Sequence, residues 1–348
     1  MLYTGRKHWE VRLMRILVTG GAGYIGSHTC VVLLEAGHEV VVVDNLCNSD
    51  RRSLSAVEKI TGKTLTLHEF DLRDREKLKT VFSEDEIDAV IHFAAFKAVG
   101  ESVGRALDYY INNLDGLFSL CEAMRADKTR KLVFSSSATV YGNPATSPIT
   151  EDFPLSATNP YGWSKLMSEQ VLRDLNTSEP GWRIALLRYF NPVGAHPSGL
   201  MGEDPTGIPN NLTPYITQVA AGRLKKLEVF GGDYNTPDGT GVRDYIHVMD
   251  LAEGHLSALD RMDEGLSVYN LGTGRGYSVL EMVDTFSRIN DCPVPYEIVA
   301  RRPGDIARCY ADASKARLEL GWQSRRTIED MCRDAWNWQK ENPNGFRD

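Results

Sequence analysis

The sequence predicts an α/β fold, in which a doubly wound parallel sheet is followed by a smaller mixed α/β domain. Two observations predict the sheet. Short apolar, β-branched runs alternate with stretches of helical length from Arg15 to about Tyr189, and the first run leads directly into a glycine-rich turn. After about Pro192 the pattern loosens, which indicates a second domain, and 348 residues are enough for two domains.

Six apolar runs are the predicted strands of the sheet. They are apolar on both faces, which is typical of parallel strands that helices cover on each side. In chain order they occupy residues 15–19, 39–44, 64–70, 88–94, 131–136 and 183–190. A sheet of this kind binds its ligand in the crevice beyond the carboxyl ends of the strands.

The stretch TGGAGYIG, residues 19–26, connects the first strand to the first helix. Gly21, Gly23 and Gly26 fit the pattern GxGxxG, and Gly20 with the last two also fits GxxGxxG. Glycines let the backbone approach a pyrophosphate, whose charge the amino end of the following helix favours. The stretch therefore predicts a Rossmann-like dinucleotide site.

Asp44 ends the second predicted strand, 18 residues beyond Gly26. A carboxylate at this place accepts hydrogen bonds from the adenine ribose hydroxyls and repels a 2′-phosphate, so the predicted cofactor is NAD rather than NADP. Arg51 and Arg52 lie nearby and would suit NADP, although arginines in such a loop more commonly face solvent.

The stretch YGWSK places Tyr161 and Lys165 one helical turn apart on the same face. A nearby ammonium lowers the pKa of a phenol from about 10, which lets tyrosine act as a general base. Alone, such a pair is more often an exposed helical contact. However, KLVFSSSATVYG (131–142) places three serines at the carboxyl end of the fifth strand, so a Ser-Tyr-Lys site beside a nicotinamide becomes the better interpretation.

The second half of the chain sets the predicted domain division. A dinucleotide-binding domain is predicted over residues 14–192 and a substrate-binding domain over 193–348, with the segment of about 243–262 returning to the first. Residues 196–211 form a proline- and glycine-rich loop that is too long for a passive connector, so we expect it to cover substrate. Residues 1–13 are expected to be an N-terminal extension.

Composition excludes several classes of function. A net charge of −8 and a pI near 5.6 argue against nucleic acid as a partner. No apolar run approaches the roughly 18 residues that span a bilayer, and no secretory signal is recognisable, so we expect a cytoplasmic protein without membrane contact. The six cysteines form no CxxC pair and the histidines no HExxH, so no metal is expected.

Seven motifs, in order and covering nearly the whole chain, resemble the extended short-chain dehydrogenase/reductase family. They are TGGAGYIG, SSSATVYG, PYGWSK, RYFNPVGAHPSG, GIPNNL, GVRDYIHVMDLA and YNLGTG. TGxxGxxG and YxxxK are common to the superfamily. RYFNPVGAHPSG with GVRDYIHV is more selective, and it is similar to the branch whose members epimerise UDP-glucose and UDP-galactose at C4.

The resemblance implies a role for individual residues. It implies that Tyr161 is the base, that Lys165 lowers its pKa and holds the nicotinamide ribose, and that Ser137 hydrogen-bonds the reacting sugar oxygen. The residues implied to bind NAD are Gly20, Gly23, Tyr24, Ile25, Gly26, Asp44, Asn45, Asp71, Leu72, Phe93, Ala94, Lys97, Asn112, Ser137, Tyr161, Lys165 and Tyr189. Those implied to contact the sugar nucleotide are Ser137, Tyr161, Asn191, Asn211, Leu212, Phe230, Arg243, Arg302, Asp305 and Cys309.

Three of these positions keep an alternative interpretation. Arg243 and Arg302 are implied to bind the diphosphate, whose oxygens match the guanidinium fork. Otherwise Arg243 would pair with Asp244, and Arg302 would be a solvated loop charge. Cys309 replaces the tyrosine of members restricted to UDP-glucose and UDP-galactose, which implies activity on UDP-GlcNAc and UDP-GalNAc, unless Cys309 merely fills core.

The implied activity is reversible 4-epimerisation of UDP-galactose and UDP-glucose through a transient 4-keto sugar, with NAD kept bound. An alternative is another NAD-dependent sugar-nucleotide enzyme such as a 4,6-dehydratase, but SSSATVYG offers no carboxylate beside Ser137 for eliminating water. A third possible function is that of a non-catalytic dinucleotide sensor. The resemblance also implies a homodimer through helices including 108–127 and 159–177, and Trp163 stands where members often carry a small cationic residue.

Overall fold

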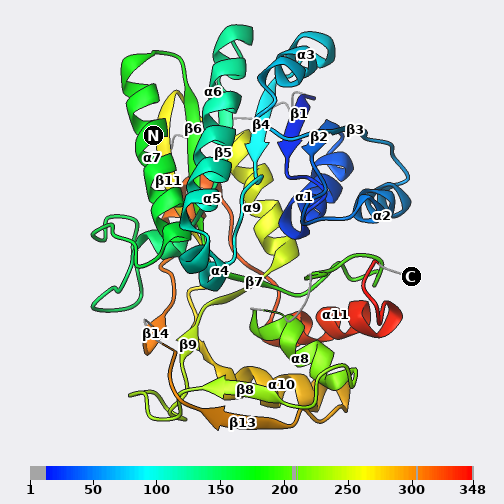
Figure 1. The fold of residues 1–348 in the computed structure, drawn as a ribbon, viewed down its shortest axis with the longest axis vertical. Coiled ribbons are helices and arrows are strands. Elements are labelled where there is room, and N and C mark those ends of the chain that lie inside the picture. Colours follow the sequence, from blue (N-terminus) through cyan, green and yellow to red (C-terminus); the bar gives the residue numbers. More distant parts are fainter. Residues whose placement is uncertain (1–12, 206–208, 210, 303–304, 347–348) are drawn as a thin grey trace, which may run out of the picture.

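The computed structural model describes residues 13–205, 209, 211–302 and 305–346, so the expected extension at 1–13 lies outside the described residues except for Leu13. Figure 1 shows a large sheet with its helices in the upper part of the molecule and a smaller group of helices and short strands below it. The two parts meet at the carboxyl ends of the large sheet's strands, because the chain crosses between them there.

The large sheet has seven strands in the order β11-β6-β5-β4-β1-β2-β3, and every neighbouring pair is parallel. The strand order reverses between β1 and β4, which is where open α/β sheets bind ligands. The predicted doubly wound, Rossmann-like sheet is confirmed. Its strands are β1 (Arg15–Thr19), β2 (Glu39–Asp44), β3 (Thr66–Glu69), β4 (Ala89–His92), β5 (Lys131–Ser137), β6 (Arg183–Tyr189) and β11 (Gly265–Leu271).

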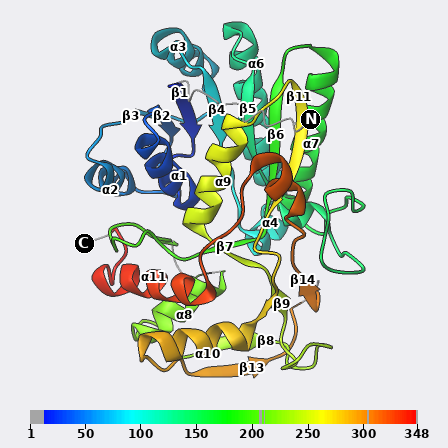
Figure 2. The ribbon, with the colours of Figure 1, turned by 180° about the vertical axis from the view of Figure 1, so that it is seen from behind.

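Helices cover both faces of this sheet because successive strand residues point to opposite sides. In β1, Ile16 and Val18 belong to the core beneath α1, α2 and α9, whereas Leu17 belongs to the core beneath α3, α6 and α7. Figures 1 and 2 show the two helical layers from opposite sides. The helical elements are α1 (Tyr24–Glu35), α2 (Arg51–Thr61), α3 (Arg75–Asp85), α4 (Val99–Gly104), α5 (Ala106–Tyr110), η1 (Ile111–Asp115), α6 (Gly116–Asp127), η2 (Ala138–Val140), α7 (Pro160–Ser178) and α9 (Val248–Asp260).

The seventh strand, β11, comes from the second half of the chain. It pairs with β6 along its whole length, from Gly265 opposite Arg183 to Leu271 opposite Tyr189. This strand is not among the six that the sequence predicts for the sheet. Helix α9 likewise lies on the large sheet, against α1. A division of the chain at residue 193 stays a prediction, and chain beyond that point contributes to the large sheet.

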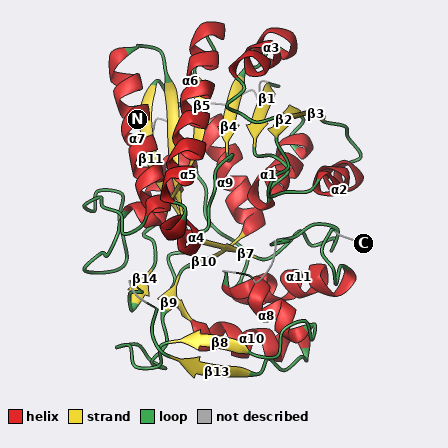
Figure 3. Cartoon of the chain, in the orientation of Figure 1, coloured by secondary structure: helices red, strands yellow, loops and turns green. Residues whose placement is uncertain are grey.

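The smaller part has one core shared by three helices and short strands. Two of the helices begin with capping boxes, formed by Ser278 with Glu281 and by Thr327 with Asp330. Figure 3 shows three short sheets in and beside this part. Its elements are β7 (Asn191–Val193), α8 (Leu212–Ala220), β8 (Leu227–Phe230), β9 (Val242–Arg243), β10 (Tyr245–His247), β12 (Tyr277–Ser278), α10 (Val279–Asn290), β13 (Tyr296–Val299), β14 (Arg308–Cys309) and α11 (Ile328–Glu341). The π-helical turn η3 (Ala316–Leu320) instead lies against β11 and belongs to a core of the large sheet.

Candidate active site

The turn between β1 and α1 forms a narrow backbone cradle. Gly20 has a φ of +72°, and a Cβ there would lie 2.7 Å from backbone nitrogen of the segment after β4. A Cβ on Gly26 would lie 2.3 Å from the Gly20 carbonyl oxygen. The N-cap residue is Gly23, and no side chain caps the helix that begins with Tyr24 and Ile25. The amino end of α1 can therefore turn its backbone N–H groups toward a pyrophosphate.

Asp44 holds its carboxylate beside this turn, at the end of β2. Its Oδ2 accepts a hydrogen bond from the Ala22 backbone nitrogen at 3.0 Å. Its Oδ1 accepts from the Leu46 backbone nitrogen at 2.9 Å and from the Ser49 hydroxyl at 2.8 Å. The carboxylate is thus fixed where a ribose would meet it, and the cradle and this acceptor together fit the adenosine half of NAD.

The predicted cofactor residues after β2 and β3 lie together. Asn45 donates to Asp71 Oδ2 at 3.2 Å. Arg73 donates twice to the same carboxylate, at 2.8 and 2.7 Å, and lowers the pKa of Asp71 to about 2. Leu72, between them, is buried. The structure therefore brings Asn45 and Asp71 into direct contact at this edge of the sheet.

Two arginines near Asp44 have acidic partners of their own. Arg51 forms an ion pair with Glu69, and Arg52 forms one with Asp50 at 2.9 Å. Both side chains are exposed. This arrangement agrees with the interpretation of Arg51 and Arg52 as a loop that faces solvent.

The segment after β4 lies at the point where the strand order reverses. The backbone nitrogens of Phe93 and Ala94 both donate to the Thr19 carbonyl oxygen, at 2.9 and 3.1 Å. Further along, the Lys97 ammonium lies 3.2 Å from a carboxylate oxygen of Glu203. The segment therefore connects the glycine turn to the loop that precedes α8.

Three more predicted cofactor residues come from separate elements. The Tyr24 hydroxyl donates to the Gly194 carbonyl oxygen at 2.7 Å. Asn112, on the π-helical turn η1, donates to the side chain of its neighbour Asn113. Tyr189 ends β6, and its hydroxyl hydrogen-bonds with His255 of α9.

Ser137 and Tyr161 meet at the carboxyl end of β5. Helix α7 begins just before Tyr161, with Pro160 in its first turn and the Asn159 side chain accepting from a backbone nitrogen of that turn. The burial of the phenol raises the pKa of Tyr161 above its usual value, and a hydrogen bond with Ser137 acts in the opposite direction. Ser137 also accepts from the Thr139 hydroxyl at 3.0 Å.

Lys165 lies on the same helix and is buried. Its ammonium donates to the Ser135 carbonyl oxygen at 2.6 Å and lies 4.9 Å from the centre of the Phe134 ring. Burial lowers the pKa of Lys165 to about 7, against the charge of Glu169. The lowering of the Tyr161 pKa by Lys165 that the resemblance implies stays a prediction, and in this structure the Lys165 ammonium is directed at the backbone of β5.

A buried ion pair holds α7 against β5 and β6. Glu169 and Arg188 are joined by two hydrogen bonds, of 2.9 and 2.6 Å, and the Ser136 hydroxyl donates to the same carboxylate at 2.6 Å. Both charged side chains are about 1% exposed. Since Ser136 precedes Ser137 and Glu169 lies one turn beyond Lys165, this pair fixes β5 and α7, which carry the candidate residues, relative to one another.

The two predicted phosphate-binding arginines converge on one carboxylate. Arg302 Nε donates to Asp305 Oδ2 at 3.0 Å, and Arg243 lies 3.7 Å from Asp305 Oδ1. The Arg302 guanidinium also lies 4.7 Å from the centre of the Phe230 ring. Asp244 is instead buried and accepts backbone hydrogen bonds, so Arg243 faces Asp305 rather than its neighbour.

Cys309 lies on β14, directly opposite Arg243 of β9. It packs against an apolar cluster that includes Tyr141 and Phe190, and burial raises the pKa of its thiol to about 11. The cluster comes from the segment after β5 and the end of β6, close to Ser137. Sequence reasoning did not single out Phe190, although it ends the RYF of a motif already recognised.

The remaining substrate residues lie on the loop and strand that leave β6. Asn191 begins β7, and its backbone nitrogen donates to the Asp244 carbonyl oxygen at 2.9 Å. Asn211 precedes Leu212, the first residue of α8, and its side chain donates to Glu203 at 2.9 Å. Glu203 is a second residue that sequence reasoning missed, because its importance depends on contacts made in space.

One relative decides the family. UDP-glucose 4-epimerase from Bacillus subtilis (strain 168) is 64% identical over 336 residues, which cover 96% of this chain and 99% of the relative. This chain belongs to the UDP-glucose 4-epimerase family. Within the extended short-chain dehydrogenase/reductases, a broader family model described as GDP-mannose 4,6 dehydratase matches residues 17–335.

Solved structures of the UDP-glucose 4-epimerase family have the same fold. The enzyme from Bifidobacterium longum, in complex with NAD+ and UDP, is 57% identical with a TM-score of 0.93, covering 95% of this chain and all of that one. The enzyme from Stenotrophomonas maltophila, with NAD and formylated UDP-arabinopyranose, is 51% identical with a TM-score of 0.93, covering 95% of this chain and 99% of that one.

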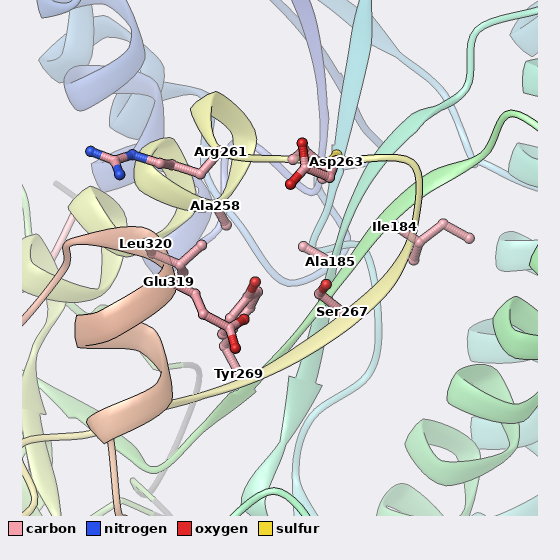
Figure 4. Close-up of a pocket in the computed structure, with 10 residues that line it drawn as sticks. Ile184, Ala185, Ala258, Arg261, Asp263, Ser267, Tyr269, Glu319 and Leu320 are labelled. Atoms are coloured by element: carbon pink, nitrogen blue, oxygen red, sulfur yellow. The ribbon is translucent and has the colours of Figure 1, made fainter. Parts of the chain in front are cut away.

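A separate cavity of about 300 Å³ lies near the amino ends of β6 and β11 (Figure 4). Ser137 and Tyr161 lie at the other end of the sheet, where the strands have their carboxyl ends. The cavity is formed where β6 and β11 begin and where α9 and η3 end. Acidic side chains and one arginine share its wall with apolar groups. Its lining residues include Ile184, Ala185, Arg261, Asp263, Ser267, Tyr269 and Glu319.

The described residues contain no group of three or more His, Cys, Asp or Glu side chains that could hold a metal ion. None of the helices within those residues is long and apolar enough to cross a membrane. All six cysteines are free thiols.

Proposed function

We propose that this protein interconverts UDP-galactose and UDP-glucose in the cytoplasm, through a transient 4-keto sugar and with NAD kept bound. The contact between Ser137 and Tyr161 at the carboxyl end of β5, with Lys165 one turn further along α7, supports the proposal in a chain of the epimerase family. Free thiols on all six cysteines agree with a reducing compartment.

Bound NAD would supply a reversible hydride acceptor for C4 of the sugar. The cradle and Asp44 would hold its adenosine half, and Lys97, Asn112 and Lys165 would lie toward the nicotinamide half.

Tyr161 would accept the proton of the sugar 4-hydroxyl, and Ser137 would hydrogen-bond the same oxygen. Burial opposes ionisation of the phenol, so Tyr161 needs hydrogen bonds and a neighbouring positive charge to act as a base near neutral pH. The YxxxK motif of the family supplies this positive charge as Lys165, one helical turn beyond Tyr161. The buried Glu169–Arg188 ion pair would keep α7, which carries Tyr161 and Lys165, in a fixed position against the sheet.

A 4,6-dehydratase is the nearest rival, and its name is carried by the broader family model. Elimination of water needs an acid and a base besides the tyrosine. Ser137 is followed by Ala138 and Thr139, and the Thr139 hydroxyl donates to Ser137, so this segment supplies neither. The geometry therefore favours epimerisation.

The direct test is to incubate purified protein with UDP-galactose, without added cofactor, and to follow UDP-glucose by chromatography. We expect conversion toward an equilibrium mixture. Formation of a 4-keto-6-deoxy sugar would indicate the dehydratase. Bound NAD without any conversion would indicate a dinucleotide sensor.

We also propose that Cys309 admits the N-acetylated pair UDP-GlcNAc and UDP-GalNAc. Cys309 borders the cluster around Phe190 and stands opposite Arg243, so its side chain lies between the sugar and phosphate regions of the proposed site. A thiol leaves more room than a phenol ring for an acetamido group, and steric exclusion is a strong filter.

Replacing Asp44 with alanine is expected to weaken NAD binding and to reduce discrimination against NADP. The fixed carboxylate would no longer accept from the ribose or repel a 2′-phosphate. The measurement is the ratio of NAD to NADP dissociation constants in stripped, refilled protein. Glu84→Ala, an exposed carboxylate near the end of α3, is the control, and an unchanged ratio in Asp44→Ala would refute the role.

We propose a homodimer formed through α4, α5, η1, α6 and α7. Large apolar side chains are exposed along these helices, including Val103 and Leu107 at 69% each and Trp163 at 41%. An apolar ring such as Trp163 suits an apolar interface better than the small cationic residue that related proteins often carry at this position.

Light scattering is expected to give about twice the 38.8 kDa chain mass. Leu107→Asp should shift the mass toward one chain, because it places a charge in an apolar interface. Leu318→Asp is the control, since Leu318 is 79% exposed on η3, away from these helices. A monomeric wild type would exclude the dimer.

A further inference from the structure

Glu203 lies between the proposed cofactor site and the proposed substrate site. One oxygen, Oε1, lies 3.2 Å from the Lys97 ammonium and accepts a hydrogen bond from the Asn211 amide at 2.9 Å. Lys97 follows β4 of the large sheet, and Asn211 precedes α8 of the smaller part. The two ligand sites thus share one anionic atom of the protein.

The surroundings make Glu203 the fixed member of this trio. Its side chain is 9% exposed, whereas that of Lys97 is 50% exposed. Its carbonyl oxygen accepts from the Trp338 indole of α11 at 3.3 Å. Its charge also reaches α1, where it adds to burial in raising the pKa of Tyr24. Glu203 is therefore held by both parts of the molecule.

The orientation of Asn211 is not explained by the stability of α8. Asn211 is the N-cap residue of that helix, yet its side chain makes no capping hydrogen bond. An N-cap asparagine normally accepts from the second or third backbone nitrogen of the helix. Here its amide donates to Glu203 instead, so the side chain is directed at the ligand region at the expense of a local cap.

We propose that Glu203 is a positioning residue that couples the two sites, so that a ligand at either one strengthens binding at the other. The inference rests on the proposed function, which places NAD at Lys97 and the sugar nucleotide at Asn211. Lys97 and Asn211 bind the same fixed oxygen of Glu203, so a ligand that orders one of them against that oxygen also restricts the other, and the second ligand then has less to order. Coupling of this kind must be reciprocal.

The experiment uses the holoenzyme and UDP as the probe. Two quantities are measured, the exchange rate of bound NAD with labelled NAD, with and without saturating UDP, and the UDP dissociation constant by calorimetry. In the wild type, UDP should slow NAD exchange by roughly 5- to 50-fold, within the usual range of coupling. In Glu203→Gln the slowing should fall to about 2-fold or less, because the amide keeps the shape but loses the charge that binds Lys97.

Asp204→Asn is the matched control. Asp204 is the next carboxylate on the same loop, and it accepts from the Phe346 backbone nitrogen rather than from Lys97 or Asn211. It should keep the wild-type effect of UDP. If Glu203→Gln does not fold, Lys97→Met should also abolish the effect of UDP on NAD exchange, because it removes the ammonium that binds Glu203.

Three results would overturn the inference in different ways. If Glu203→Gln weakens both ligands but UDP still slows exchange as in the wild type, Glu203 is only structural. If UDP does not alter exchange in the wild type, the sites are not coupled. If the protein binds neither NAD nor UDP, the proposed function itself fails.

Discussion

Replacing Tyr161 with phenylalanine is expected to abolish nearly all turnover of UDP-galactose while leaving NAD and UDP bound. The variant removes only the ionisable oxygen, which is hydrogen-bonded with Ser137, and keeps the ring in its partly buried place. A positioned general base contributes about 10²- to 10⁴-fold to a reaction, so a loss of that size is expected.

The measurement is initial UDP-glucose formation, together with NAD content and the UDP dissociation constant. Tyr296→Phe is the control, because Tyr296 lies on β13 and is 44% exposed. More than about a tenth of the wild-type rate in Tyr161→Phe would remove Tyr161 from the role of base. Loss of NAD together with the rate would show a structural defect instead.

Replacing Cys309 with tyrosine is expected to abolish conversion of UDP-GalNAc to UDP-GlcNAc while sparing that of UDP-galactose. Cys309 packs against a buried cluster that includes Phe190 and Tyr141. A phenol ring would therefore project toward the sugar region and occupy the room that an acetamido group needs. A fall of at least about 100-fold in kcat/KM for the acetylated substrate is expected from such a clash.

Both substrate pairs must be assayed on both proteins. Cys309→Ser is the matched control, since it keeps a small side chain and should keep both activities. A wild type inactive on the acetylated pair would end the proposal. Equal loss of both activities in Cys309→Tyr would show that Cys309 fills core, which its partial burial also permits.

The sequence by itself determined the six consecutive strands of the sheet, the glycine turn and the Ser-Tyr-Lys set. Each depends on short-range rules. β-Branched runs form buried strands, glycine allows the positive φ of Gly20, and residues four apart share a helix face, as Tyr161 and Lys165 do. Such rules act within one element or one turn, so they can be read before the chain is folded.

Only the tertiary structure decided which distant segments meet. It placed β11 beside β6, brought Arg243 and Arg302 to Asp305, and put Glu203 between the two proposed ligand sites. It also directed the Lys165 ammonium to a backbone carbonyl of β5. A strand pattern does not specify its neighbour, and a charge does not specify its partner, because both are fixed by packing and hydrogen bonds between residues far apart in the chain.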